Sequence, residues 1–184
     1  SIVQGKGFKV FDDSEIIISI NVEGCSNYSR KQIDELTDFV KTPQIGSKGL
    51  VYIKNNEDGT IKSSVDKFYS EDDLKMIIDE NNSNPSDLIL ILAGDVKQTI
   101  SAMSSLRLLV GDRLNLRDPE IFNPVWVINF PLVAWDEESK RYHAMHHPFT
   151  SPIKDDIDLL NSNPEEVRAN AYDLVINGVE IGGG

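Results

Sequence analysis

The sequence has one cysteine, Cys25, and few basic residues for its 184-residue length. A single cysteine excludes an intrachain disulfide, and such sparse cysteine is typical of a reducing compartment, so we expect a cytoplasmic protein. Lysine and arginine number 18 against 30 aspartates and glutamates, for a net charge of -12. Because binding to nucleic acid requires a basic face, we expect this chain by itself to bind nucleic acid only weakly.

Long apolar runs are also absent. No stretch approaches the roughly 18 residues of a membrane-spanning helix, and residues 1–9 lack a signal peptide's apolar core, so we expect no contact with a membrane. The sequence has no glycine-rich phosphate loop, no dinucleotide-binding fingerprint and no Cys/His spacing for zinc. The missing initiator methionine and the final three glycines lead us to expect that both ends were cut from a longer protein.

The first half of the sequence alternates between strand and helix patterns. Ser29 with Gln32, and Ser70 with Asp73, form capping boxes that predict the starts of two helices, and a third should start at Asp95. We expect strand-strand-helix-strand repeats in a two-layer α/β domain within an α+β chain. The predicted strands are 8–11, 16–22, 50–53 and 88–93, and the apolar stripe of the third helix is Val96, Ile100, Met103, Leu106, Val110 and Leu114.

A linker is predicted at residues 115–124. Pro119 and Pro124, together with several Asn and Asp residues, interrupt both the helical and the strand periodicity there. The segment divides the chain into one expected domain at 1–114 and another at 125–184.

The second part is rich in strand patterns. We expect a long strand at 125–135, a polar turn at 136–140 and a returning strand at 141–145, which together form a wide antiparallel hairpin. Asn163 followed by Pro164 predicts a short helix capped by Asn163, with proline at the first helical position.

Asn177 and Gly178 lie between alternating apolar residues, which is a strong signal for a tight hairpin. A two-residue turn there places Asp173 opposite Gly182, with Asp173 and Glu180 on one face of the hairpin. Diagonal neighbours on a sheet lie within about 7 to 8 Å of each other, so a magnesium ion is able to bind between the two carboxylates.

The glycines that follow, Gly182, Gly183 and Gly184, leave the same surface free of side chains, so a ligand is able to lie against the backbone. Together with the two carboxylates they predict the floor of a pocket. Two plainer interpretations stay open: Asp173 and Glu180 are solvated residues of an ordinary hairpin, and the glycines are a flexible tail.

His146 and His147 precede Pro148, which favours an extended backbone. Adjacent side chains then point apart, so we expect one imidazole to bind a ligand and the other to orient the loop, unless both are loop residues without a role. His143 is expected to be structural or exposed. Ser151 has no base at a recognisable spacing, so nucleophilic catalysis is unsupported.

Three of these segments resemble bacterial aspartyl-tRNA synthetases. They are Phe-Pro-Leu at 130–132, Ala-Met-His-His-Pro-Phe-Thr-Ser-Pro at 144–152, and Asn-Ala-Tyr-Asp-Leu-Val-Ile-Asn-Gly at 170–178 with Glu180. In the first half, residues 30–35, 48–54 and 106–108 resemble the GAD domain inserted in this family and shared with the amidotransferase B subunit. The resemblance covers nearly the whole chain from about Ser29 onward.

The resemblance implies an internal fragment, with the inserted GAD domain, of DCoH-like fold, at 1–114 and part of the antiparallel class II catalytic sheet at 125–184. The parent enzyme is then an aspartate–tRNA ligase that uses ATP and Mg²⁺ to activate L-aspartate and transfers it to tRNA(Asp), as a homodimer. The fragment is expected to be inactive, because the family's ATP-gripping motif and its substrate-reading arginine lie outside the sequence.

Several residue roles are carried over from the family to this sequence. His146 is expected to contact aspartate, Glu180 to contact ATP, and Asp173 with Glu180 to hold the magnesium ion. His147 is expected to support the loop, and residues 182–184 to floor the pocket under the aminoacyl-adenylate. No side-chain nucleophile is implied, so positioning and electrostatics supply the catalysis.

An alternative from another functional class rests on the first domain alone. Residues 1–114 are then a non-catalytic accessory module that binds RNA or protein, related to the insert of the amidotransferase B subunit. The resemblance leaves open what the inserted domain does and whether the parent also charges the asparagine tRNA.

Overall fold

The computed structural model describes residues 2–118 and 120–184. The chain divides into two compact units, Ser1–Leu116 and Arg117–Gly184. The division lies inside the segment assigned to a linker, and Pro119 of that segment lies outside the described residues. No helix in the described ranges is both long enough and apolar enough to cross a bilayer.

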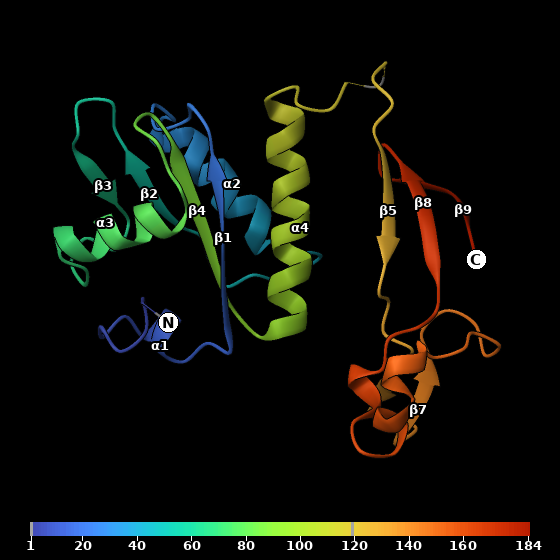
Figure 1. Cartoon of the computed structure of the whole chain (residues 1–184). Coiled ribbons are helices and arrows are strands. Elements are labelled where there is room, and N and C mark those ends of the chain that lie inside the picture. Colours follow the sequence, from blue (N-terminus) through green and yellow to red (C-terminus); the bar gives the residue numbers. More distant parts are fainter. Residues whose placement is uncertain (1, 119) are drawn as a thin grey trace. The chain divides into compact units, whose positions relative to one another are not determined.

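The first unit is built on a four-stranded antiparallel sheet with strand order β1-β4-β2-β3 (Figure 1). Its strands are β1 (Ile16–Val22), β2 (Val51–Asn55), β3 (Ile61–Ser63) and β4 (Leu88–Gly94). Its helices are α1 (Lys9–Asp12), α2 (Arg30–Lys41), α3 (Glu71–Glu80) and α4 (Val96–Arg113).

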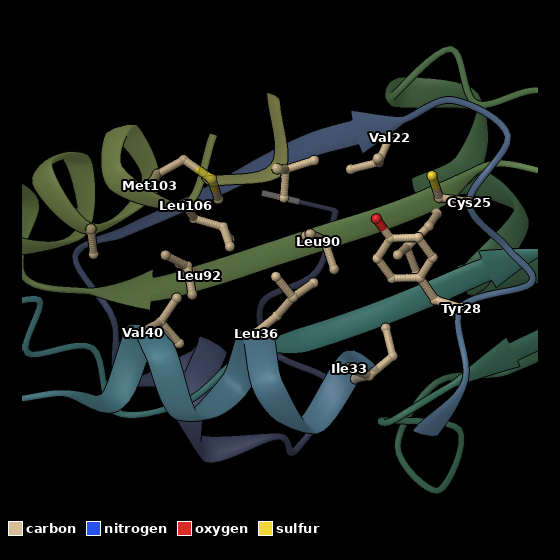
Figure 2. Close-up of a cluster of buried hydrophobic side chains, with 13 residues drawn as sticks. Val22, Cys25, Tyr28, Ile33, Leu36, Val40, Leu90, Leu92, Met103 and Leu106 are labelled. Atoms are coloured by element: carbon tan, nitrogen blue, oxygen red, sulfur yellow. The ribbon is translucent and has the colours of Figure 1, made fainter. Parts of the chain in front are cut away.

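Both faces of this sheet are covered. Leu90 and Leu92 of β4 meet the buried face of α2, led by Leu36, in a cluster that α4 also joins (Figure 2). Ile89 and Ile91 point to the other face, where α1 and α3 form a second cluster. The mixed α/β architecture with antiparallel sheets is confirmed, but the expected two layers are wrong for this unit, because helix patterns do not indicate which face each helix covers.

The predicted helix starts are confirmed. The Ser29 hydroxyl accepts a hydrogen bond from the Gln32 amide, and the Gln32 side chain accepts one from the Ser29 amide at 2.9 Å. Ser70 and Asp73 make the same reciprocal pair, and the Asp95 carboxylate caps α4. These bonds satisfy amide groups that have no partner within the helix.

Two expectations about this unit are wrong. Residues 8–11 are not a strand: Lys9–Asp12 forms one helical turn that buries Phe11 completely. The stripe of α4 is also displaced in its first turn, since Val96 and Ile100 are 44% and 50% exposed, whereas Met103, Leu106 and Val110 are buried as predicted. At residues 8–11 a short apolar segment fits a helical turn as well as a strand, and in α4 the helical spacing does not show where the contact with the sheet begins.

Asp87 closes the start of β4. Its buried carboxylate accepts hydrogen bonds from the Asn21 side chain at 2.8 Å and from the amides of Gly24 and Asn84 at 2.9 and 2.8 Å. Burial alone would raise the pKa of Asp87, but the three hydrogen bonds outweigh it and hold the pKa below its usual value. A charged residue is therefore fixed immediately before the first residue of the apolar strand β4.

The second unit has two small antiparallel sheets. One has the order β5-β8-β9 and the other pairs β6 with β7. The strands are β5 (Pro124–Ile128), β6 (Val133–Asp136), β7 (Arg141–Ala144), β8 (Tyr172–Ile176) and β9 (Val179–Gly183), and the 3-10 helices are η1 (Lys154–Asn161) and η2 (Pro164–Glu166).

The long strand expected at 125–135 is wrong. Asn129 has a positive φ of 61° and Pro131 has no amide proton, so the chain leaves the first sheet after β5 and enters the second at β6. Only β6 and β7 form the expected hairpin. A helical turn begins at Pro164 as predicted, but the Asn163 side chain makes no capping hydrogen bond.

A small core supports these strands. Val167 and Ala169 are buried, and so is Asp156, which binds Arg168 through two side-chain hydrogen bonds of 2.8 and 2.9 Å. These hydrogen bonds lower the pKa of Asp156 to about 2. The pair therefore stabilises the segment that carries β8.

Candidate functional site

The predicted hairpin turn at Asn177 and Gly178 is confirmed. Both residues have positive φ, 51° and 83°, and Val175 lies opposite Glu180 as expected. The Asn177 side chain also accepts a hydrogen bond from the amide of Asn123 at 2.9 Å, which ties the turn to the start of β5.

The register beyond the turn differs from the prediction. A β-bulge between Leu174 and Val175 leaves Ile181 without a partner, so Asp173 lies opposite Gly183 and not Gly182. Asp173 and Val175 still project from the same face of β8, the face that Glu180 shares across the hairpin. The bulge adds one residue between Glu180 and the partner of Asp173, and a turn signal contains no information about such an insertion.

Gly183 lies directly under the Asp173 carboxylate. A Cβ atom at this glycine would be 2.3 Å from Asp173 Oδ1 and 2.8 Å from the Tyr172 carbonyl oxygen, so only glycine leaves both groups in place. A Cβ at Gly184 would be 3.0 Å from the Tyr172 hydroxyl, whereas one at Gly182 would meet no atom within 4 Å. Of the three glycines, Gly183 is therefore the one required by close contact.

The two loop histidines make different contacts. The ring of His146 packs edge-on against Phe130, with 4.3 Å between centroids. His147 Nδ1 accepts a hydrogen bond from the Phe149 amide at 3.2 Å, and the two rings are in contact. His147 is thus bonded within its own loop, while the exposed His146 makes no hydrogen bond within the described ranges.

His143 lies in another cluster, on the β6–β7 hairpin. Its Nε2 atom is 2.8 Å from the Ser139 hydroxyl and 3.5 Å from Asp136 Oδ2. Ser139 donates its proton to Asp136 at 2.6 Å, and this bond lowers the pKa of Asp136. The cluster thus fastens the hairpin turn, so the histidine has a local structural role.

Asp173 and Glu180 place two carboxylates on one face of the β8–β9 hairpin. Across residues 2–118 and 120–184, no group of three or more His, Cys, Asp and Glu side chains gathers as a metal site. Magnesium takes oxygen ligands and usually keeps several waters, with only one or two carboxylates and the phosphates of its nucleotide. The number of carboxylates on this face matches the number that such an ion takes from protein.

Two supporting residues were not found from the sequence as site residues. Phe130 holds the His146 ring, and its carbonyl oxygen accepts a hydrogen bond from the Ala169 amide at 2.6 Å. Arg168 bridges to Pro131 and binds Asp156. The only available signal was the Phe-Pro-Leu segment at 130–132, because contacts between residues so far apart in the chain leave no local pattern.

Known proteins of one name match all or nearly all of the chain. The chain is 56% identical to the Aspartate–tRNA ligase of Azobacteroides pseudotrichonymphae over 180 residues, 98% of this chain and 31% of that protein. It is 54% identical to the enzyme of the same name from Porphyromonas gingivalis over all 184 residues, again 31% of the relative. The one from Flavobacterium psychrophilum is 52% identical over 179 residues, 97% of this chain and 31% of the relative.

The chain thus spans about a third of the length of the curated relatives that it matches. The family model described as GAD domain matches residues 9–103, which are just over half of the chain and lie entirely within the first unit. With that match, the chain belongs to the GAD domain family.

Proposed function

We propose that the chain is an internal part of an aspartate–tRNA ligase, which activates L-aspartate with ATP and transfers it to tRNA(Asp). The proposal is carried by the similarity of all or nearly all of the chain to ligases of that name, at 52 to 56% identity. We expect the 184 residues alone to be inactive, since they correspond to about a third of those enzymes.

The second unit supplies one wall of the proposed active site. His146 is assigned to the aspartate substrate, because its exposed ring is held by Phe130 and makes no hydrogen bond within the described ranges. Asp173 and Glu180 are assigned to ATP and its magnesium ion, since they project from the same face of the β8–β9 hairpin. When bound, magnesium neutralises negative charge on the ATP phosphates.

The remaining assignments concern residues that support the loop of His146 and the β8–β9 hairpin. His147 orients the loop through its hydrogen bond from Phe149, and residues 182–184 floor the pocket, with Gly183 against the Asp173 carboxylate. The chain's own residues therefore bind and orient the reactants, and none of those assigned is a nucleophile.

The domain assignment and setting are also proposals. Residues 1–114 are the inserted domain, 115–124 the linker, and 125–184 part of a class II catalytic domain. The parent is proposed to be a homodimer, as the family resemblance implies, and to be cytoplasmic, in keeping with the single buried cysteine of this chain.

Aspartate-dependent exchange between ATP and pyrophosphate tests the proposal in the full-length protein that contains these residues. His146→Ala and Glu180→Ala should each lower the exchange rate by roughly two orders of magnitude, because both remove a group that positions a reactant. His143→Ala is the matched control, since that imidazole binds the β6–β7 turn, and it should retain nearly full exchange. An unaltered rate in both site variants would remove the site assignment, and no exchange by the parent would remove the function.

One observation favours a second candidate. The family match is confined to the first unit, which has a sheet and two core clusters of its own. That unit is then a non-catalytic module that binds RNA or protein. The natural gene distinguishes the two: a Ser-x-Arg continuation within a dozen residues after Gly184 supports the ligase, and its absence supports the module.

A further inference from the structure

A notch in the first unit lies between the start of α2 and the β2–β3 hairpin. It has a volume of about 440 Å³ and lies beside the edge strand, since β3 has only β2 as a neighbour. Helix α2 packs its buried residues toward β4, which leaves this outer part of the sheet uncovered. The lining residues are Arg30, Ile33, Asp34, Tyr52, Lys54 and Lys62.

Two of the lining cations face each other. Lys54 and Lys62 are directly opposite in the β2–β3 ladder, so their side chains share one face of the sheet. Like charges at such a position destabilise a strand pair. In the described part of the chain neither ammonium group has a carboxylate within 4.0 Å, so the pair has no direct counter-charge.

Lys54 is also held in place. Its ammonium group donates a hydrogen bond to the carbonyl oxygen of Tyr28, in the loop before α2. Burial lowers the pKa of Lys54, and the nearby charge of Lys62 lowers it further. An anion bound between the two lysines would relieve this repulsion.

The local charge is opposite to that of the molecule. Arg30, Lys54 and Lys62 face a single carboxylate in the notch, that of Asp34, in a chain whose net charge is -12. Asp34 pairs with Arg30 at 3.8 Å, and the two side chains are 64% and 94% exposed. So exposed a pair is weak, and it leaves the guanidinium available to another anion.

The outer rim of the notch does contain acidic residues. Asp58, in the β2–β3 turn, lines an adjoining hollow that shares Lys62. Hydrogen bonds from Thr60 lower the pKa of Asp58 first, and Lys62 adds a smaller effect. The Asp58 carboxylate is therefore bound mainly within its own turn and offsets the charge of Lys62 only in part.

We propose that this notch binds a nucleotide, with its phosphate at the three cations and its base against Tyr52. Lysine and arginine are the usual ligands of phosphate, and a cavity of about 440 Å³ holds more than a phosphate alone. The half-buried Tyr52 supplies the apolar surface for a base, backed by Ile33, which is buried in the adjoining core cluster. A free nucleotide and a single-stranded RNA offer the same group, and this inference does not rest on the ligase proposal.

Amide chemical shifts of the 184-residue chain test the site, with uridine monophosphate and a six-residue oligouridylate as probes. Both should shift the amides of Arg30, Lys54 and Lys62. Lys62→Gln should weaken binding roughly 3- to 10-fold and reduce the slope of log affinity against log salt by about 0.7, the loss of one phosphate contact on a single strand. Lys97→Gln, an equal charge change at an exposed residue of α4 outside the notch, should leave both unchanged.

Each outcome of the titration decides something. Tighter binding of the oligouridylate supports RNA as the source of the phosphate, and equal binding of the monophosphate supports a free nucleotide. Absence of shifts at the notch with both probes overturns the proposal, and so does an equal effect of Lys62→Gln and Lys97→Gln. A hexaglutamate peptide that binds there as tightly as the oligouridylate would overturn it in favour of an acidic protein segment.

Discussion

A methyl group at residue 183 would overlap the Asp173 carboxylate. Because its Cβ would be 2.3 Å from Asp173 Oδ1, we expect Gly183→Ala to displace the carboxylate or the end of β9. A displacement of about 1 Å in a positioning group costs on the order of 100-fold in rate, so exchange by the proposed full-length ligase should fall by 10- to 100-fold. The ATP–pyrophosphate exchange rate measures this loss.

Gly182→Ala is the matched control, since a Cβ at that position meets no atom within 4 Å. It should lose less activity than Gly183→Ala, because it adds a methyl group to the proposed pocket floor but leaves the Asp173 carboxylate in place. Equal losses in the two variants would indicate that the glycines act as a group and that contact with Asp173 is irrelevant.

Asp156 gives the second unit a predictable response to acid. The hydrogen bonds from Arg168 lower its folded-state pKa to about 2, below the unfolded value of about 3.9. A depressed pKa means that the stabilisation is fully present above about pH 4 and is lost as the pH falls toward 2. The difference in melting temperature between the natural chain and Asp156→Asn should therefore be largest near neutral pH and shrink over that window.

Tryptophan fluorescence follows this transition selectively, because both tryptophans, Trp126 and Trp135, belong to the second unit. Asp158→Asn makes the same charge change at an exposed residue of η1 and should have little effect at any pH. A difference between natural chain and Asp156→Asn that is constant from pH 7 to 2 would contradict the assignment.

At the scale of elements, the capping box at Ser29 should contribute measurably to the first unit. Ser29→Ala removes the oxygen that accepts the Gln32 amide proton, so we expect a loss of about 1 kcal/mol in the free energy of unfolding. Urea unfolding followed by far-ultraviolet circular dichroism measures it, since every α-helix of the described chain lies in this unit.

Ser104→Ala serves as the comparison. Ser104 is exposed in the interior of α4, where alanine has the higher helix propensity, so its replacement should leave stability unchanged or slightly increased. A loss in Ser104→Ala as large as in Ser29→Ala would mean that the cap contributes nothing specific.

The elements that the sequence predicted well are those with a chemical start or turn. Ser29, Ser70 and Asp95 begin helices, and Asn177 with Gly178 makes the hairpin turn. Such residues act on neighbours within four positions, so their effect is visible locally.

Elsewhere the decisive interaction was distant. The break after Ile128 depends on separate partners for β5 and β6, and the bulge at Ile181 depends on how two strands align beyond their turn. Asp173 lies opposite Gly183 because of that bulge, so the hairpin that carries the candidate residues was predicted but its register was not. The alternation of apolar and polar residues along one segment indicates neither the partner of a strand nor its register.

For the whole molecule, we expect uneven resistance to proteolysis. The sheet β5-β8-β9 exposes large apolar side chains, among them Trp126 at 59%, Val179 at 65% and Ile181 at 57%, and it has two open edges. Fewer buried contacts favour local opening, so brief digestion should cut within residues 117–184 before it cuts within 1–116.

Mass spectrometry of the early products identifies the first cut sites. The four-stranded unit, with its two buried clusters, should persist as the larger product. Cleavage of both units at the same rate would show that the second one is as well protected as the first.

The two buried faces of β4 have a consequence for how the chain folds. The two sides of β4 are equally apolar, with leucines on one and isoleucines on the other. A shift of its pairing register by one residue would therefore exchange one set of apolar side chains for another at little cost in free energy. Asp87 disfavours this register shift, because the shift would separate its ionised carboxylate from the three groups that donate hydrogen bonds to it. The register of β4 in this sheet is thus fixed by one acidic residue at the start of the strand. Asp87→Leu should yield a chain that still becomes compact but pairs β4 with its neighbours in more than one register.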